Sequence, residues 1–145
     1  MPGLSEMPTV LLVEDSNEDA DTVATAFARS GVKGTLRRVA GGDACIALLK
    51  MSRPAPSLVI MDLNTPGMNG RQALRIIKSD PLLRTIPIVV SSTSSSGKDR
   101  DYCYQVGANA YHVKPVRYPD YLQAVERLLQ YWLIQVSLPE PGRAG

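Results

Sequence analysis

The sequence predicts an α/β fold, a single doubly wound, five-stranded parallel sheet with five helices. Short apolar runs rich in Val and Ile alternate along the chain with stretches of helical period, a pattern typical of βα repeats. Some of these runs are almost continuously apolar, as in Leu58-Val59-Ile60-Met61. Strands of this kind are buried on both faces, so we expect helices on both sides of the sheet.

Five runs have the length and composition of strands. They lie at about residues 9–14, 35–40, 57–62, 86–91 and 109–113. The helices expected between and after them span about residues 17–31, 42–52, 69–80, 99–107 and 119–136. Four of the helix starts carry local signals, either a polar residue that can cap the first turn or a proline inside it. These signals are Ser16 with Asp19, Ser96 with Asp99, Asn69 before Gly70, and Pro119.

The 145 residues are enough for one domain, which we expect at residues 9–136. Residues 1–8 are interpreted as an N-terminal extension, and residues 137–145, which include Pro139, Pro141 and Gly142, as a flexible tail. The formal net charge of +2 is too mild to suggest a nucleic-acid partner. The sequence has neither an apolar run long enough to cross a membrane nor a signal-peptide layout, so we expect a cytoplasmic protein.

Four of the predicted strands end on polar residues. Glu14 and Asp15 follow the first strand, Asp62 the third, Ser92 the fourth and Lys114 the fifth. Ligands of open α/β sheets bind outside the carboxyl ends of the strands, where residues distant in sequence meet. These five side chains are therefore expected to form one site.

The expected site has the chemistry for phosphoryl transfer. Three carboxylates held close together need a cation, and oxygen ligands favour Mg²⁺, to which Asn64 could add its backbone carbonyl. An aspartate can accept a phosphoryl group covalently, and Asp62 is the predicted nucleophile. Lys114 would neutralise the transferred group and Ser92 would donate a hydrogen bond to it.

Each of these residues also has a purely structural interpretation. Glu14 and Asp15 could form a turn or a helix cap, and Asp62 could begin an ordinary loop. Lys114 could simply be the first residue after a strand. The occurrence of all of them in order, at strand ends with β/α spacing, favours the functional interpretation.

The chain resembles the receiver domains of two-component response regulators, whose fold is flavodoxin-like, over residues 9–132. The matching segments are residues 13–16, 61–70, 86–92 and 107–115, and the loop MDLNTPGMNG at 61–70 is the most specific. The resemblance implies that Asp62 is the phosphoacceptor, that Glu14, Asp15 and the Asn64 carbonyl serve Mg²⁺, and that Lys114 and Ser92 bind the phosphoryl group. It also implies a switch in which Ser92 moves and Tyr111 fills the space. Two departures are small: Ser92 stands where threonine is commoner, and Thr65 where methionine often precedes the proline.

The fifth predicted helix carries a wide apolar stripe. Its members are Leu122, Val125, Leu129, Trp132, Leu133 and Val136, with Tyr121 and Leu128 on one side. The helix could simply cover more of the core, but an exposed stripe of this width favours a homodimer with Tyr121, Leu128 and Trp132 near its two-fold axis. Residues 131–139 also resemble the ending of the small stand-alone regulators that are paired with phytochrome histidine kinases.

These observations predict a stand-alone response regulator, phosphorylated by a sensor histidine kinase, that signals through protein contacts and is not an enzyme with its own substrate. A phosphate sink or an intermediate of a phosphorelay would have the same site. A phosphatase with an aspartate nucleophile is a further alternative, but it usually has a second carboxylate where this chain has Asn64. A receiver-like interaction module that is never phosphorylated typically lacks one of the acidic or lysine residues that this chain keeps.

Overall fold

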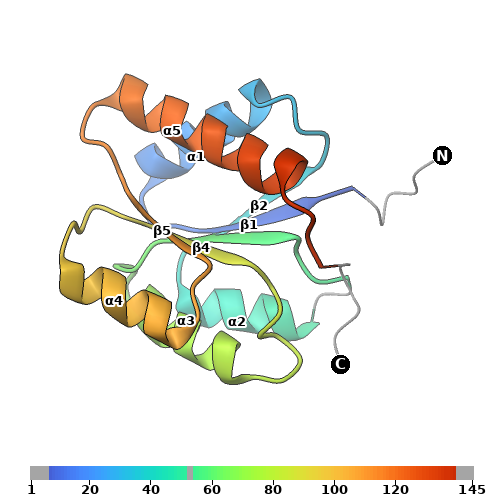
Figure 1. Cartoon of the computed structure of the whole chain (residues 1–145), viewed down its shortest axis with the longest axis vertical. Helices are drawn as coiled ribbons and strands as arrows, with labels where there is room; N and C mark the ends of the chain where they lie inside the picture. Colours follow the sequence, from blue (N-terminus) through green and yellow to red (C-terminus); the bar gives the residue numbers. More distant parts are fainter. Residues whose placement is uncertain (1–6, 52–53, 140–145) are drawn as a thin grey trace.

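The computed structural model describes residues 7–51 and 54–139, and over these residues it confirms the predicted architecture. Five parallel strands alternate with five α-helices, and a short π-helical segment follows the last of them (Figure 1). The strands are β1 (Thr9–Val13), β2 (Thr35–Val39), β3 (Leu58–Met61), β4 (Ile88–Ser92) and β5 (Ala110–Val113). The helices are α1 (Asn17–Arg29), α2 (Gly42–Met51), α3 (Gly70–Ser79), α4 (Gly97–Val106), α5 (Tyr118–Gln130) and the π segment η2 (Tyr131–Gln135).

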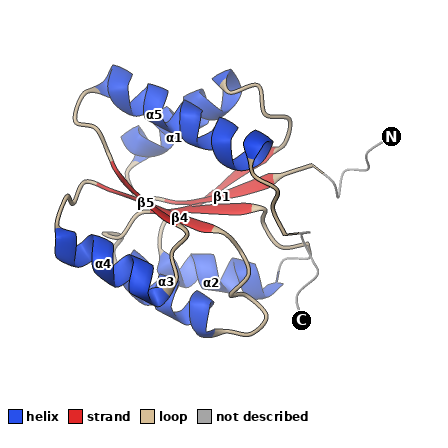
Figure 2. Cartoon of the chain, viewed as in Figure 1, coloured by secondary structure: helices blue, strands red, loops and turns tan. Residues whose placement is uncertain are grey.

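The strand order in the sheet is β2-β1-β3-β4-β5, and every neighbouring pair is parallel. Figure 2 shows the sheet as the middle layer between two layers of helices. The order reverses direction at β1 and β3, which lie side by side although β2 comes between them in the sequence. A crevice at such a switch point, outside the carboxyl ends of the strands, is where ligands of open α/β sheets bind.

Each face of the sheet has its own hydrophobic core. Strand alternation sends Val10 and Leu12 of β1 toward α1 and α5, and Leu11 and Val13 toward α2, α3 and α4. All four side chains are at most 3% exposed. Both faces of the central strands are therefore covered, as their nearly continuous apolar sequence predicts.

The predicted helix starts are close to those observed. Ser16 and Ser96 are the N-caps of α1 and α4, and each hydroxyl accepts a backbone hydrogen bond from the third helical residue. Because Ser96 is the cap, α4 begins at Gly97, two residues earlier than predicted. Asn69 forms a complete capping box with Gln72 at the start of α3. The fourth strand also runs one residue further than predicted, so Ser92 is its last residue.

The end of the last helix differs from the prediction. The regular helix stops at Gln130, and Tyr131–Gln135 continue as a π segment. The Val136 N–H closes this segment on the Tyr131 carbonyl at 3.0 Å. Trp132 and Leu133, the predicted stripe residues in this segment, are partly buried and still pack against the core that α5 shares with α1. Tyr131 and Ile134, which lie outside the predicted stripe, are 57% and 59% exposed.

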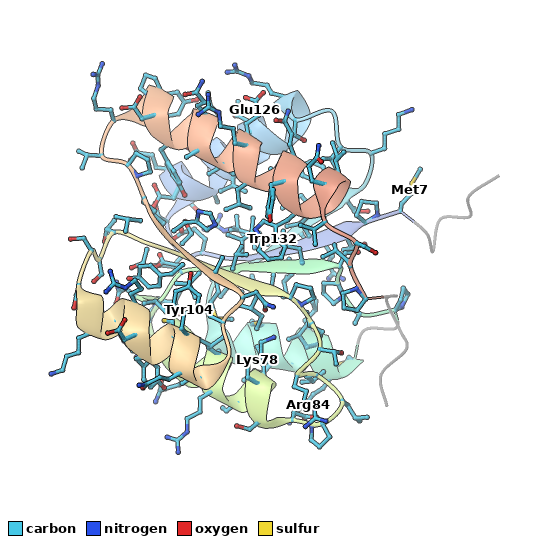
Figure 3. All side chains as sticks on the ribbon, viewed as in Figure 1. Met7, Lys78, Arg84, Tyr104, Glu126 and Trp132 are labelled. Carbon is cyan, nitrogen blue, oxygen red and sulfur yellow. The ribbon has the colours of Figure 1, made fainter. Side chains whose placement is uncertain are left out.

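The expected dimer contact through Tyr121 and Leu128 is wrong in this fold. Both side chains belong to the core between α5, α1 and the sheet, with 7% and 6% of their surface exposed. Figure 1 shows α1 and α5 side by side on the same face, so α5 packs against a helix as well as the sheet and needs a wider apolar stripe. Trp132, near the start of η2, is partly buried and packs against the same core (Figure 3).

Two other predictions concern the ends of the chain. Residues 1–6 of the predicted extension and residues 140–145 of the predicted tail lie outside the described residues. Of the helices in residues 7–51 and 54–139, none is both long enough and apolar enough to cross a lipid bilayer.

Candidate functional site

Three carboxylates meet where β1 and β3 end. The Asp62 N–H donates to the Val13 carbonyl at 3.0 Å and holds the end of β3 beside the end of β1. This contact gathers Glu14, Asp15 and Asp62, which can each offer one oxygen such that all three atoms lie within 4.8 Å of one another. Glu14 is 2% exposed and Asp62 9%, whereas Asp15 faces solvent. The site is therefore a cluster of negative charge with two buried members and one at the surface.

The loop after β3 is folded tightly around Asp62. The Asn64 N–H donates to Asp62 Oδ1 at 3.1 Å, and the Gly70 N–H donates to the Leu63 carbonyl at 3.0 Å. A Cβ atom on Gly70 would overlap the Asp62 carbonyl oxygen, so this close approach of α3 to the loop requires glycine. The backbone thus binds Oδ1 of Asp62 and leaves Oδ2 for the contact with Lys114.

Lys114 brings the only ammonium group that the described residues place among these carboxylates. Its Nζ lies 2.6 Å from Glu14 Oε1, 2.8 Å from Asp19 Oδ2 and 3.2 Å from Asp62 Oδ2. Its backbone N–H donates to the Ser92 carbonyl at 2.7 Å, which fixes the end of β5 beside the end of β4. The lysine side chain is only 5% exposed, so its ion pairs with Glu14 and Asp62 are shielded from water.

Burial affects the two ends of the Lys114–Glu14 pair differently. Burial by itself lowers the pKa of the Lys114 ammonium, but the hydrogen bonds to Asp19 and Glu14 outweigh it and raise that pKa. Burial raises the pKa of the Glu14 carboxyl and outweighs the hydrogen bond from Lys114, which lowers it. Lys114 therefore stays charged. A further cation close by would stabilise the charged form of Glu14.

Ser92 and Tyr111 are linked through one residue of the β4–α4 loop. The Ser92 hydroxyl is fully buried and accepts the Ser94 N–H at 3.1 Å. The Tyr111 hydroxyl donates to the Ser94 carbonyl at 2.8 Å, and the Tyr111 N–H donates to the Tyr104 hydroxyl at 3.2 Å. Ser94 thus connects the strand-end hydroxyl to the aromatic side chain of β5.

A second ion pair joins the first turns of α3 and α4. Arg71 bonds to Asp99 Oδ1, and the Ser94 hydroxyl donates to Asp99 Oδ2 at 2.6 Å. The Ser94 hydroxyl and the Arg71 guanidinium lower the pKa of the Asp99 carboxyl. These contacts hold the β4–α4 loop, which carries Ser94, against the neighbouring helix.

The structure places most of the sequence-predicted residues together. Glu14, Asp62 and Lys114 are in direct contact, Asp15 completes the carboxylate group, and Asn64 lies in the loop that bonds to Asp62. Sequence reasoning missed Asp19 as a partner of Lys114, and Arg71 with Asp99. The two aspartates were recognisable in the sequence only as first-turn residues of their helices, which suggested a capping role.

The donor set suits a hard divalent cation. Glu14, Asp15 and Asp62 offer carboxylate oxygens, which Mg²⁺ and Mn²⁺ prefer over nitrogen or sulfur. The exposed position of Asp15 leaves one side of the group open to water and to further oxygen ligands. Mg²⁺ usually keeps several such ligands in its octahedron, so the open geometry fits it.

Comparison with known proteins gives a consistent result. Residues 10–126 match the family model for the response regulator receiver domain. The chain is 36% identical over 137 residues to the probable methanogenesis regulatory protein FilR2 of Methanothrix harundinacea. The matched region covers 92% of this chain and 88% of that protein.

Two solved structures are also similar over nearly their whole length. The phosphorylated cyanobacterial phytochrome response regulator RcpA is 33% identical, with a TM-score of 0.88 over 92% of this chain and 99% of that chain. The Mn²⁺-bound response regulator Rcp1, a protein known from Synechocystis, is 34% identical, with a TM-score of 0.87 over 91% and 99% of the two chains. One of these neighbours is thus phosphorylated and the other holds a divalent cation.

Proposed function

The chain belongs to the response regulator receiver domain family, and we propose that it accepts a phosphoryl group on Asp62 from a sensor histidine kinase. The observation that carries this proposal is the convergence of charge around Asp62. Lys114 Nζ lies 3.2 Å from Asp62 Oδ2, and oxygens of Glu14, Asp15 and Asp62 lie within 4.8 Å of one another. Positioning and charge neutralisation are most of what phosphoryl transfer requires.

In the proposed reaction a carboxylate oxygen of Asp62 attacks the phosphorus atom of the donor. A new P–O bond forms, and the bond from phosphorus to the donor breaks with its electron pair leaving on the donor. That donor atom is a nitrogen of a phosphohistidine or the acetate oxygen of acetyl phosphate. Lys114 neutralises charge on the transferred group, and Ser92 donates a hydrogen bond to one of its oxygens. Neither residue has to transfer a proton.

Glu14, Asp15, Asp62 and the Asn64 carbonyl would hold Mg²⁺ in this site. When bound, the ion neutralises negative charge on the phosphoryl oxygens and orients them. Asp15, the exposed member of the carboxylate cluster, lies at the surface. A donor can therefore approach Asp62 from the side of Asp15, where the cation would lie.

We propose that Ser92 and Tyr111 report the phosphorylated state to the surface. A phosphoryl group on Asp62 would accept a hydrogen bond from the Ser92 O–H, and a Ser92 hydroxyl drawn toward it would leave the bond that it accepts from the Ser94 N–H. Because the Ser94 carbonyl accepts the Tyr111 hydroxyl, a shift of Ser94 changes the position of the aromatic side chain. The resulting change in the surface around β5 would alter protein contacts, which are the proposed output.

The similarity to RcpA and Rcp1 favours a phytochrome histidine kinase as the partner. A kinase that uses ATP places this exchange in the cytoplasm. The phosphoryl group has two further destinations, water in a phosphate sink and a second histidine in a phosphorelay, and both start from the same aspartyl phosphate. In none of these roles is the protein an enzyme with a substrate of its own.

A homodimer remains part of the proposal, with a changed contact surface. Since Tyr121 and Leu128 are buried, the surface would be formed by Trp132 with its exposed neighbours Tyr131 and Ile134. The Tyr131 and Trp132 rings already pack edge to face, with centroids 5.7 Å apart. Aromatic residues on a helix end are suited to a self-complementary contact between two copies.

Intact-mass measurement tests the proposed phosphorylation. The wild-type chain with Mg²⁺ and excess acetyl phosphate should gain the mass of one phosphoryl group, and Asp62→Asn should gain none. Asp21→Asn, a matched change at an exposed position of α1, should behave as wild type. Phosphorylation of Asp62→Asn, or none of the wild type, would contradict the assignment.

A further inference from the structure

The ammonium group of Lys114 has three N–H donors, and each one meets a different carboxylate. The distances from Nζ are 2.6 Å to Glu14, 2.8 Å to Asp19 and 3.2 Å to Asp62. The two shorter bonds go to Glu14 and Asp19, which come from the end of β1 and the first turn of α1. The longest bond goes to Asp62, the residue proposed to carry the phosphoryl group. The lysine is thus held by two carboxylates and directed at a third.

Asp19 is well placed for this contact. Its backbone N–H is bound by the Ser16 hydroxyl at 3.1 Å, which fixes the first turn of α1. In a capping box its carboxylate would return to the Ser16 N–H. That N–H instead donates to Glu14 Oε2 at 3.2 Å, so the Asp19 carboxylate is free to bind Lys114. The side chain of Asp19 is 30% exposed, which makes it the outer of the two short contacts.

We infer that Asp19 is a positioning residue for phosphoryl transfer, which with Glu14 holds the Lys114 ammonium so that its third N–H points at Asp62. The inference rests on the proposed phosphorylation of Asp62. As the new P–O bond forms and the donor's bond breaks, this third N–H moves from the Asp62 oxygen to a phosphoryl oxygen. The bonds to Glu14 and Asp19 remain, and no proton leaves the lysine.

Asp19 is outside the carboxylate group that could hold a cation, which comprises Glu14, Asp15 and Asp62. Its effect should therefore appear in the transfer step and not in Mg²⁺ affinity. A different role for Asp19 would change the phosphorylation rate in the opposite direction. If Asp19 were only a negative charge near the site, it would repel an incoming phosphoryl group, and removing the charge would speed phosphorylation. The direction of the change consequently separates the two roles.

The test compares Asp19→Ala and Asp19→Asn with Glu18→Ala and Glu18→Gln. Glu18 is the preceding residue of the same first turn, is exposed, and among the described contacts makes no bond to Lys114. The two pairs of variants change the charge of the helix start equally. Full-length proteins are mixed with Mg²⁺ and a series of acetyl phosphate concentrations, and the fraction phosphorylated is followed by intact mass over time.

Asp19→Ala should lower the maximal rate of phosphorylation roughly tenfold, because a charge-assisted hydrogen bond that orients the lysine is lost. Asp19→Asn keeps an oxygen acceptor and should recover part of the rate. The half-saturating Mg²⁺ concentration should stay at the wild-type value in both, and both Glu18 variants should match the wild type throughout. Partial rescue by Asn together with unchanged Mg²⁺ dependence is not expected of a residue that only supports the fold.

An Asp19→Ala protein phosphorylated as fast as wild type, or faster, would overturn the inference. So would equal rates for Asp19→Ala and Asp19→Asn, because the hydrogen bond would then be irrelevant. If Asp19→Ala does not fold, Asp19→Asn decides alone: a rate below that of Glu18→Gln supports positioning, and an equal or higher rate refutes it. Failure of the wild type to become phosphorylated would instead refute the proposed function.

Discussion

Asp15→Asn should stabilise the fold in metal-free buffer and remove most of the stabilisation by Mg²⁺. Asp15 is the exposed member of the carboxylate group, with its oxygen within 4.8 Å of Glu14 and Asp62 oxygens. Among the described residues, Lys114 pairs with Glu14, Asp19 and Asp62 and not with Asp15. The Asp15 charge is thus close to like charges without a direct counter-charge of its own.

The size of the effect follows from Coulomb's law. Two unit charges about 5 Å apart repel by ~1 kcal/mol in a water-like dielectric, which is the appropriate limit for an exposed carboxylate. Two such neighbours, partly offset by Lys114, leave a net repulsion of about 1 kcal/mol. For a domain of this size that corresponds to a rise in melting temperature of about 3 to 5 °C.

Mg²⁺ should reverse the order of the two proteins. A ligand that binds only the folded state stabilises it by about 2.7 kcal/mol at one hundred times its dissociation constant. The wild type should gain this amount, whereas Asp15→Asn lacks one of the proposed ligands and should gain much less. Thermal unfolding of both proteins, in EDTA and in excess Mg²⁺, measures the four values.

Asp21→Asn, an exposed change on α1, serves as the control and should shift neither melting temperature by much. The reasoning is refuted if Asp15→Asn melts at or below the wild-type temperature in EDTA. It is also refuted if both proteins gain equally from Mg²⁺, because Asp15 would then be neither a source of repulsion nor a ligand.

Two further predictions concern the core. Leu128→Glu places a carboxylate at a 6% exposed position and should cost about 3 to 5 kcal/mol of unfolding free energy, whereas Ile134→Glu, at a 59% exposed position, should cost less than about 0.5 kcal/mol. Urea titration compares the stabilities of the two variants, and equal midpoints would contradict the core assignment of Leu128. Sedimentation should show that Ile134→Glu weakens the proposed dimer. An unchanged dimer would contradict the proposal that Ile134 lies in the dimer contact. Burial raises the pKa of both cysteine thiols, that of Cys45 to about 12, so neither Cys45 nor Cys103 should react with a thiol reagent at neutral pH until the chain is unfolded. Rapid labelling of the native protein would show that one of them is accessible.

The fold and the centre of the site could be predicted because they depend on local patterns. Apolar runs mark the strands, and parallel strands bring their carboxyl ends to one edge. Glu14, Asp62 and Lys114 follow three different strands directly, so the topology alone places them together. Their contacts agree with that reasoning, since Lys114 bonds to both carboxylates.

The last helix shows where a local pattern is insufficient. A helical period gives the width of the apolar stripe but not the number of surfaces that the stripe meets. Tyr121 and Leu128 widen the stripe because α5 packs against α1 as well as the sheet. The π segment was also beyond prediction, because Leu129, Trp132, Leu133 and Val136 keep the spacing of a regular helix. The error at Tyr121 and Leu128 comes from tertiary packing, which the pattern of one helix does not contain.

The first turns of α1 and α4 explain why two charged contacts near the site could not be read from the sequence. Ser16 and Ser96 each precede an aspartate at capping-box spacing, but neither aspartate completes the box. In both cases a residue two positions before the cap accepts its backbone N–H instead. The Ser16 N–H donates to Glu14 Oε2 and the Ser96 N–H to the Ser94 hydroxyl.

Each aspartate is thereby released for a distant partner, Lys114 for Asp19 and Arg71 for Asp99. At α3, by contrast, the Asn69 N–H is bound by Gln72, and the box is complete. An acidic residue at this spacing is therefore ambiguous whenever a hydrogen-bond acceptor stands two residues before the cap. In this chain both ambiguous residues form ion pairs: Asp19 binds Lys114 inside the candidate site, and Asp99 binds Arg71 beside the β4–α4 loop.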